Sequence, residues 1–96
     1  MLEPKRIRTK ALRKLWEDGD ESGINPDWLD RIELYLAGLN AATRPSDLDS
    51  PGFHFHALKG KRKGQYSLRV SGNWRITFEW DDDGPHSVKL EDYHGK

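Results

Sequence analysis

Residues 65–80 read QYSLRVSGNWRITFEW, and they indicate most clearly how the chain folds. Apolar and polar side chains alternate before and after residues 71–72, a pattern typical of strands that bury one face. The Ser-Gly pair at 71–72 is typical of a tight hairpin turn. In the second strand the alternation places on one face Trp74, Ile76, Phe78 and Trp80. The stretch therefore predicts an antiparallel hairpin with one buried face.

Two further segments with the same alternation flank this hairpin. Residues 53–58, FHFHAL, are joined to it by the glycine-bounded basic loop 59–64. On the other side, residues 81–85 carry a second turn signal, and residues 86–91 have the pattern of a last strand. Short turns between successive strands are typical of antiparallel pairing. We therefore predict a four-stranded antiparallel meander.

Helical spacing replaces this alternation in the first part of the chain. Pro4 suits the first turn of a helix, and the residues that follow repeat with a helical period until about Gly19. The apolar face contains Ile7, Ala11, Leu12, Leu15 and Trp16. The opposite face is basic and contains Arg6, Lys10, Arg13 and Lys14. We predict an amphipathic helix with a basic outer stripe.

A second helix is predicted to begin at Asn25 and Pro26, an N-cap residue followed by the residue favoured at the first helical position. Its apolar stripe contains Trp28, Leu29, Ile32, Tyr35, Leu36 and Leu39. Leu34 falls outside this stripe. Two helices followed by a meander indicate an α+β fold, with both helices packed on one face of the sheet and polar side chains exposed on the other. We expect a single domain, residues 1–96.

Composition limits the classes of protein to which this chain can belong. It has no cysteine, which excludes disulfides and cysteine-ligated zinc and suits a reducing compartment. The start of the chain has no apolar segment of signal-peptide length, and no run is long enough to cross a bilayer. We therefore expect a soluble cytoplasmic protein without a membrane partner.

The net charge of zero conceals two basic segments. Residues 1–14 carry six Lys/Arg against one Glu, and residues 59–75 carry six Lys/Arg and no acid. Acidic residues predominate in 15–58 and 76–96. The basic segments could form a face that binds the phosphates of a nucleic acid, or they could be ordinary solvated surfaces. Charge alone leaves both interpretations open.

Groups suited to phosphodiester chemistry recur at separated places in the second half of the chain. His56 and Lys59 lie near the end of the first strand, Arg75 lies on the third, and residues 92–94 read Asp-Tyr-His. RNA cleavage without a metal needs a base for the 2′-OH, cations for the developing phosphorane charge and an acid for the leaving 5′-oxygen. Histidines suit the proton transfers, and Lys59 and Arg75 suit the phosphate. A meander that joins these groups can break a phosphodiester.

Other interpretations of the same residues remain open. Each histidine could be an ordinary surface residue, and Asp92 could cap the terminal turn. His54 and His56 share one face of the predicted strand and could bind zinc if His86 or His94 completed the ligand set. A helix-turn-helix DNA reader is not indicated, because the two helices lead into a sheet rather than a recognition helix.

Several short blocks of the sequence together resemble one known family. They are His56-Ala57-Leu58-Lys59-Gly60, Arg62-Lys63-Gly64, Ser67-Leu68-Arg69-Val70, Asn73-Trp74-Arg75-Ile76-Thr77-Phe78 and Glu91-Asp92-Tyr93-His94. In this combination and spacing the chain resembles the HigB toxins of the RelE-like toxin superfamily, over nearly its whole length. It departs from that pattern at Ala57, where relatives commonly have proline, and at Pro4, where they tend to open with a short apolar strand.

The resemblance implies a RelE-like fold and a ribosome-dependent, metal-independent mRNA endonuclease that acts at the A site of the small ribosomal subunit without a cofactor. It also implies a HigA-type helix-turn-helix antitoxin, through which alone the toxin meets operator DNA. The residues expected to be catalytic are His56, Asp92, Tyr93 and His94. The expected phosphate contacts are Lys59, Arg75, Asn73, Lys61, Arg62 and Lys63. Which histidine acts as base and which as acid stays open.

Two functions without catalysis remain as alternatives. The superfamily includes proteins that resemble gyrase inhibitors and lack the histidine set. The basic segments would also suit a plain RNA- or ribosome-binding toxin. The presence of His56, Lys59 and His94 favours the nuclease. Cleaved transcripts would distinguish it from both alternatives.

Overall fold

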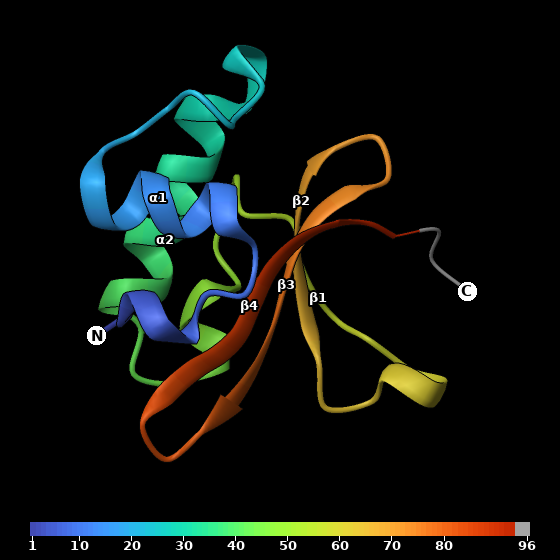
Figure 1. The fold of residues 1–96 in the computed structure, drawn as a ribbon. Helices are drawn as coiled ribbons and strands as arrows, with labels where there is room; N and C mark the ends of the chain where they lie inside the picture. The colour runs from blue at the N-terminus through green and yellow to red at the C-terminus, as the bar shows by residue number, and fades with distance from the viewer. Residues whose placement is uncertain (94–96) are drawn as a thin grey trace.

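The computed structural model of the chain describes residues 1–93. Two α-helices precede four strands, which pair antiparallel in the order β1-β2-β3-β4. Their bounds are α1 Lys10–Asp18, α2 Leu29–Ala41, β1 Phe55–Ala57, β2 Tyr66–Ser71, β3 Trp74–Asp81 and β4 Gly84–Asp92. Both helices lie on the same side of the sheet (Figure 1). The predicted α+β meander is therefore confirmed.

The segment before α1 differs from the prediction of a helix that starts at Pro4. Residues Pro4–Arg6 form only a 3-10 turn, and Ile7 then pairs in parallel with Val88 at the edge of β4. The hydroxyl of Thr9 accepts a hydrogen bond from the backbone N–H of Leu90 at 2.9 Å, and α1 begins one residue later. The physical reason is that the free edge of β4 offers backbone groups that need partners, and an extended segment satisfies them.

The ends of the helices follow the predicted signals. Gly19 ends α1 in the left-handed region, at φ 69°, and its N–H donates to the carbonyl of Leu15. The side chain of Asn25 accepts from the N–H of Asp27 at 2.9 Å and starts a 3-10 turn that leads into α2. Leu34, which lies outside the predicted stripe, is the exposed leucine of α2.

The first strand is shorter than its alternating sequence predicts. His54 has a φ of 51°, so the alternation of faces begins only at Phe55. Phe53 instead packs against the core, with its ring 5.5 Å from that of Tyr35. A Cβ on Gly38 of α2 would lie only 2.5 Å from the Phe53 ring, so glycine is required there for the helix to approach. The core thus removes two residues from the start of the strand, which also ends at Ala57, one residue earlier than predicted.

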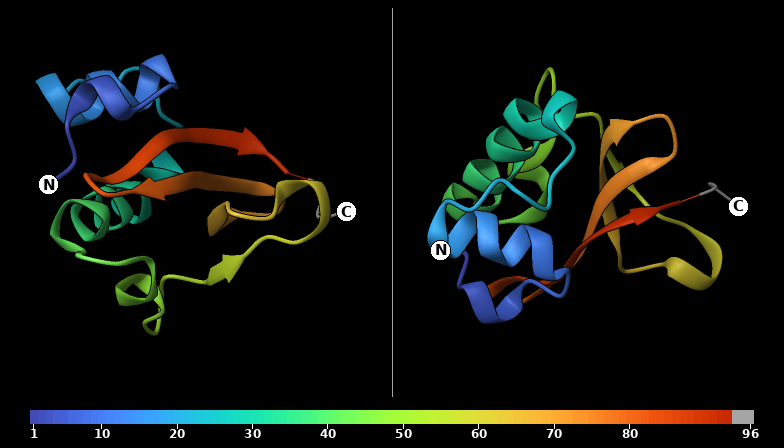
Figure 2. Two further views of the ribbon diagram at one scale, coloured as in Figure 1. Left: turned by 90° about the horizontal axis from the view of Figure 1, so that it is seen from below. Right: turned by 45° about the horizontal axis from the view of Figure 1, so that its top comes forward.

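The side of the sheet away from the helices is polar, but it is not open as the sequence predicted. Residues His56, Ser67, Thr77 and Lys89 form one row across β1, β2, β3 and β4. Ser67 and Thr77 in the middle of this row are fully buried. From the loop between β1 and β2, Arg62 reaches across this side to Glu91 of β4. Figure 2 shows this loop and the end of β4 at the end of the molecule away from the helices.

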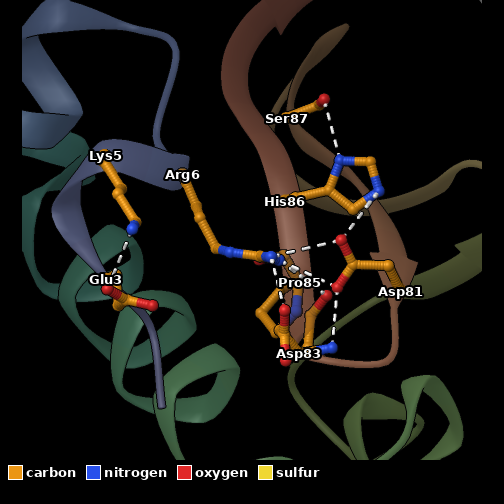
Figure 3. Close-up of polar contacts among 9 residues, drawn as sticks. Glu3, Lys5, Arg6, Asp81, Asp83, Pro85, His86 and Ser87 are labelled. Carbon is orange, nitrogen blue, oxygen red and sulfur yellow. Dashed lines mark hydrogen bonds and ion pairs between the residues drawn. The ribbon is translucent and has the colours of Figure 1, made fainter.

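An arginine fastens the turn of the β3–β4 hairpin to the N-terminal segment (Figure 3). Both terminal nitrogens of Arg6 donate to the carboxylate of Asp81, at 3.0 and 3.2 Å, and one also contacts the carbonyls of Gly84 and Pro85. These bonds hold the pKa of Asp81 below its usual value. No helix within residues 1–93 is long and apolar enough to span a bilayer.

Candidate active site

A pocket of about 780 Å³ opens between the β1–β2 loop and the polar side of the sheet. Its walls are formed by residues from β1, the following loop, β2, β3 and the end of β4. They are His56, Ala57, Leu58, Lys59, Gly60, Lys61, Ser67, Arg75 and Tyr93. Segments that are far apart in the sequence therefore supply an imidazole, two amines, a guanidinium and a phenol to one cavity.

Strand register explains how these groups converge. His56 of β1 lies opposite Ser67 of β2, and Arg75 of β3 lies opposite Glu91 of β4 on the same side of the sheet. Neighbouring strands are about 4.8 Å apart, so side chains of β1 and of the end of β4 can reach one ligand across the four-stranded sheet. Tyr93 extends the pairing beyond β4, because its N–H donates to the carbonyl of Asn73 at 2.8 Å.

Lys59 and Lys61 reach the pocket because the chain turns sharply after β1. Leu58 is buried and its N–H donates to the carbonyl of Gln65 at 2.9 Å, which closes the base of the loop. Gly60 then adopts a φ of 66°, a conformation that a side chain disfavours. Both lysines are exposed, as phosphate-binding cations should be.

Three other described residues of the predicted site do not line this pocket: Lys63, Asn73 and Asp92. Lys63 lines a neighbouring hollow on the loop rather than the pocket. Asn73 sits in the β2–β3 turn and contributes its carbonyl to Tyr93. Asp92 pairs with Trp74, so strand alternation puts it on the opposite side of the sheet from Glu91. His94 lies outside the described residues.

Arg62, predicted to contact phosphate, is engaged by the protein itself. Its terminal nitrogens donate to both oxygens of Glu91, at 3.0 and 2.6 Å, and its Nε donates to the side chain of Gln65 at 3.0 Å. The hydroxyl of Thr77 also donates to Glu91. The bonds from Arg62 hold the pKa of Glu91 below its usual value, although partial burial acts in the opposite direction. The same pair raises the pKa of Arg62.

Tyr93 contacts two guanidinium groups. The central carbon of Arg62 lies 4.9 Å from the centroid of its ring, and that of Arg75 lies 5.6 Å away. Both distances are within the range of cation–π attraction. The phenol is therefore held by the paired arginine on one hand and by a pocket-lining arginine on the other.

Two buried polar atoms of the pocket have no hydrogen-bond partner among residues 1–93. They are the hydroxyl oxygen of Ser67 and the Nε of Arg75. Buried polar atoms are usually paired, and leaving one unpaired costs about 1–3 kcal/mol. The N–H at Arg75 Nε is a donor that suits a ligand with an acceptor such as a phosphate oxygen.

The histidines of the zinc hypothesis do not gather in the described part of the chain. Within residues 1–93, no three potential ligand side chains are grouped so that they could hold a metal ion. His86 lies near the β3–β4 turn, where its Nδ1 is 3.1 Å from the hydroxyl of Ser87. His54 is exposed and precedes β1.

Sequence reasoning missed Glu91, Ser67 and Thr77 as parts of this site. The alternation within each strand already placed Thr77 with Arg75 and Glu91 with Lys89. What it did not provide is the register between strands, which puts Glu91 opposite Arg75 and Ser67 between His56 and Thr77. The basic loop 59–64 and the carboxylate of Glu91 on the polar side of the last strand were the available sequence signal for an ion pair.

Comparisons with known proteins identify the family. The sequence profile described as "RelE-like toxin of type II toxin-antitoxin system HigB" matches residues 5–94. The chain belongs to the HigB toxin family. This HigB-family toxin is 37% identical over 90 residues to "Endoribonuclease HigB" of Proteus vulgaris, which covers 94% of this chain and 98% of that protein. It is 34% identical over 78 residues to "Toxin HigB-1" of Vibrio cholerae, which covers 79% of this chain and 82% of that toxin.

Membership confirms the predicted family and has a direct consequence for partners. A HigB toxin is one half of a type II toxin–antitoxin system, which implies an antitoxin as its partner. The matched range contains every residue that lines the pocket of this HigB-family toxin. The site is therefore part of the shared family domain.

Proposed function

We propose that this HigB-family toxin is an endoribonuclease that cleaves mRNA on the ribosome. The observation that carries the proposal is the convergence of His56, Lys59, Arg75 and Tyr93 on one pocket. The imidazole suits one of the two proton transfers that RNA cleavage by side chains alone requires, and the two cations suit the charge that develops on the phosphate. The Proteus vulgaris relative is named as an endoribonuclease, which supports the same activity.

The proposed reaction is general acid–base cleavage without a metal. One imidazole acts as the base and removes the proton from a ribose 2′-OH, and that oxygen attacks the phosphorus. The bond from phosphorus to the 5′-oxygen breaks as a second group, acting as the acid, protonates the leaving oxygen. His56 lines the pocket, and His94 follows the pocket residue Tyr93 directly in the sequence, so these two are the proposed proton carriers. Lys59 and Arg75 offset the charge that develops on the phosphate.

Mapping of transcript ends on programmed ribosomes tests the proposal. Toxin treated with EDTA, with the chelator removed before ribosomes are added, should cut ribosome-bound mRNA at an undiminished rate. His56→Ala and His94→Ala should each slow cutting by about 10²–10⁴-fold. Circular dichroism checks that each variant is folded. Intact transcripts with the parent would instead indicate a gyrase-poison-like or purely RNA-binding toxin. Loss of cutting after this treatment of the toxin alone would indicate a metal-dependent nuclease.

The ribosome is proposed to meet the basic outer face of α1. Lys10 and Lys14 are exposed on this helix, whereas Arg13 donates to the carbonyl of Ile7 at 2.9 Å and is partly used by the fold. Reversal of Lys10 and Lys14 to Glu should weaken ribosome association and flatten its dependence on salt, since fewer counterions are released. Unchanged association in sedimentation assays would exclude this face.

The antitoxin is proposed to be of the HigA type, a helix-turn-helix protein that neutralises the toxin in the cytoplasm and carries it to operator DNA. Co-expression of the neighbouring reading frame tests this directly. We expect it to restore growth and to co-purify with the toxin. A toxin that stays active and free in the presence of that protein would contradict the assignment.

A further inference from the structure

Glu91 is a densely bonded carboxylate next to the pocket, yet it does not line it. Both of its oxygens accept hydrogen bonds from the guanidinium of Arg62, and one also accepts from the hydroxyl of Thr77. Lys89 contributes a longer ion pair at 3.9 Å. With its oxygens occupied in this way, Glu91 is not free to take a proton from a substrate, so its role must be sought in what it holds.

Arg62 links this carboxylate to the pocket wall. The side chain projects from the β1–β2 loop, and only 23% of it is exposed. Gln65 accepts from its Nε and from one terminal nitrogen, at 3.0 and 2.7 Å. The paired, planar guanidinium then lies 4.9 Å from the centroid of the Tyr93 ring. A bidentate fork of this kind fixes orientation as well as distance.

A series of side-chain contacts therefore connects a buried part of the sheet to the phenol of Tyr93. Thr77 is fully buried and anchors Glu91, Glu91 orients Arg62, and Arg62 contacts the ring of Tyr93. Tyr93 itself comes after the end of β4, where its N–H bond to Asn73 holds its backbone but not its side chain. A ring in that position needs a lateral contact to stay in one orientation.

We propose that Glu91 is a positioning residue of the active site, which acts through Arg62 to hold the Tyr93 ring in the pocket. This inference rests on the proposed nuclease function only for its consequence in catalysis. The positioning itself is a property of the folded protein and can be measured without substrate. Misplacement of a catalytic group by about 1 Å can cost about 10²-fold in rate.

The first experiment observes Tyr93 directly. With selectively labelled tyrosine, the protein gives ring signals from Tyr35, Tyr66 and Tyr93. Glu91→Gln keeps the size of the side chain but removes the charge that orders Arg62. We expect the Tyr93 signal to shift and its ring to become more mobile, while the two core tyrosines stay unchanged. An unaltered Tyr93 signal would overturn the inference, whether or not the protein cleaves RNA.

The second experiment measures the consequence for cleavage. Glu91→Gln should lower kcat on programmed ribosomes by about 10- to 100-fold with little change in KM, because substrate binding relies on other cations. Asp81→Asn is the matched control, since it breaks a similar bidentate arginine pair at the far end of the hairpin. It should cut at the parent's rate.

A double variant separates positioning from an independent role. If Glu91 acts through the phenol, Glu91→Gln should add nothing in a Tyr93→Phe background that already lacks the hydroxyl. Multiplication of the two losses would show that Glu91 acts elsewhere and would overturn the inference. A parent that cuts no RNA would refute the proposed function instead, and the labelled-tyrosine result would still stand.

Discussion

Each end of the β3–β4 hairpin has an arginine that donates two hydrogen bonds to one carboxylate, but the two pairs have different roles. At the turn, Arg6 pairs in this way with Asp81, and at the open end Arg62 pairs with Glu91. The first carboxylate is 45% exposed, and its arginine otherwise contacts two main-chain carbonyls and the carboxylate of Asp83 in the same turn. The second is 24% exposed, accepts a further bond from Thr77, and its arginine lies against Tyr93.

The difference shows that an arginine–carboxylate pair takes its role from the third group that it touches. Where the guanidinium otherwise contacts only groups of a surface turn, as at Arg6, the pair joins two segments of the fold. Where it ends on a side chain that lines a cavity, as at Arg62, the pair controls the geometry of that cavity. Burial then makes the second pair harder to replace by water.

The largest expected contrast concerns cleavage. Arg75→Ala removes a guanidinium from the pocket and should lower the single-turnover rate by about 10²–10³-fold, since a donor to the developing charge is lost. Arg6→Ala removes a guanidinium from the turn and should leave the saturated rate close to that of the parent. Equal losses in the two variants would break the distinction between the ends.

A smaller effect is expected on stability. Thr77→Val removes the buried hydroxyl that donates to Glu91 and should reduce the free energy of unfolding by about 1–3 kcal/mol. Thr43→Val removes a similar bond to Asp47 on the exposed surface and should have little effect. Urea denaturation of both variants measures the difference. An unchanged free energy of unfolding in Thr77→Val would show that Glu91 is not anchored through this hydroxyl.

Low pH should reduce the stabilisation that both arginine–carboxylate pairs contribute, and the loss should be larger for the Arg62–Glu91 pair at the pocket. The folded pKa of Glu91 is depressed by its bonds from Arg62, so the stabilisation is present above its unfolded pKa of about 4.5 and is lost as the pH falls through the folded value. Glu91→Gln should therefore flatten the fall of unfolding free energy below about pH 4.5. Asp81, also depressed by its arginine, should follow the same sign with a smaller change, because it is more exposed.

The smallest effect is expected from salt. The stability difference between Asp81→Asn and the parent should shrink as NaCl is raised, because ions screen an exposed pair. The corresponding difference for Glu91→Gln should persist, since the half-buried fork is screened less. Thermal melts at low and high salt provide both comparisons. Equal salt sensitivity at the two ends would contradict the burial argument.

Much of the fold could be predicted from local patterns. The period-two alternation of residues 65–80 and the turn signal at 71–72 gave β2 and β3 nearly to the residue. The Asn25 cap placed the entry to α2, and Gly19 placed the end of α1. These predictions succeeded because caps, turns and faces depend on neighbours in the chain.

The misplaced elements depended on distant partners. The start at Pro4 was predicted as a helix because the pairing of Ile7 with the edge of β4 is invisible to a local pattern. The length of β1 was overestimated because Phe53 is drawn into the core beside Gly38. In both places tertiary contacts outweighed a plausible local preference.

By itself, the sequence determined which chemistry is available: the histidines, the basic loop, the sheet that presents them and the family to which they belong. Only the tertiary structure decided which of these groups share a pocket and that Arg62 is bound to Glu91 rather than free for phosphate. It also placed Asp92 on the opposite side of the sheet. The reason is that side-chain alternation is a property of one strand, whereas register belongs to the packed sheet, and a shift of one residue would exchange its two faces.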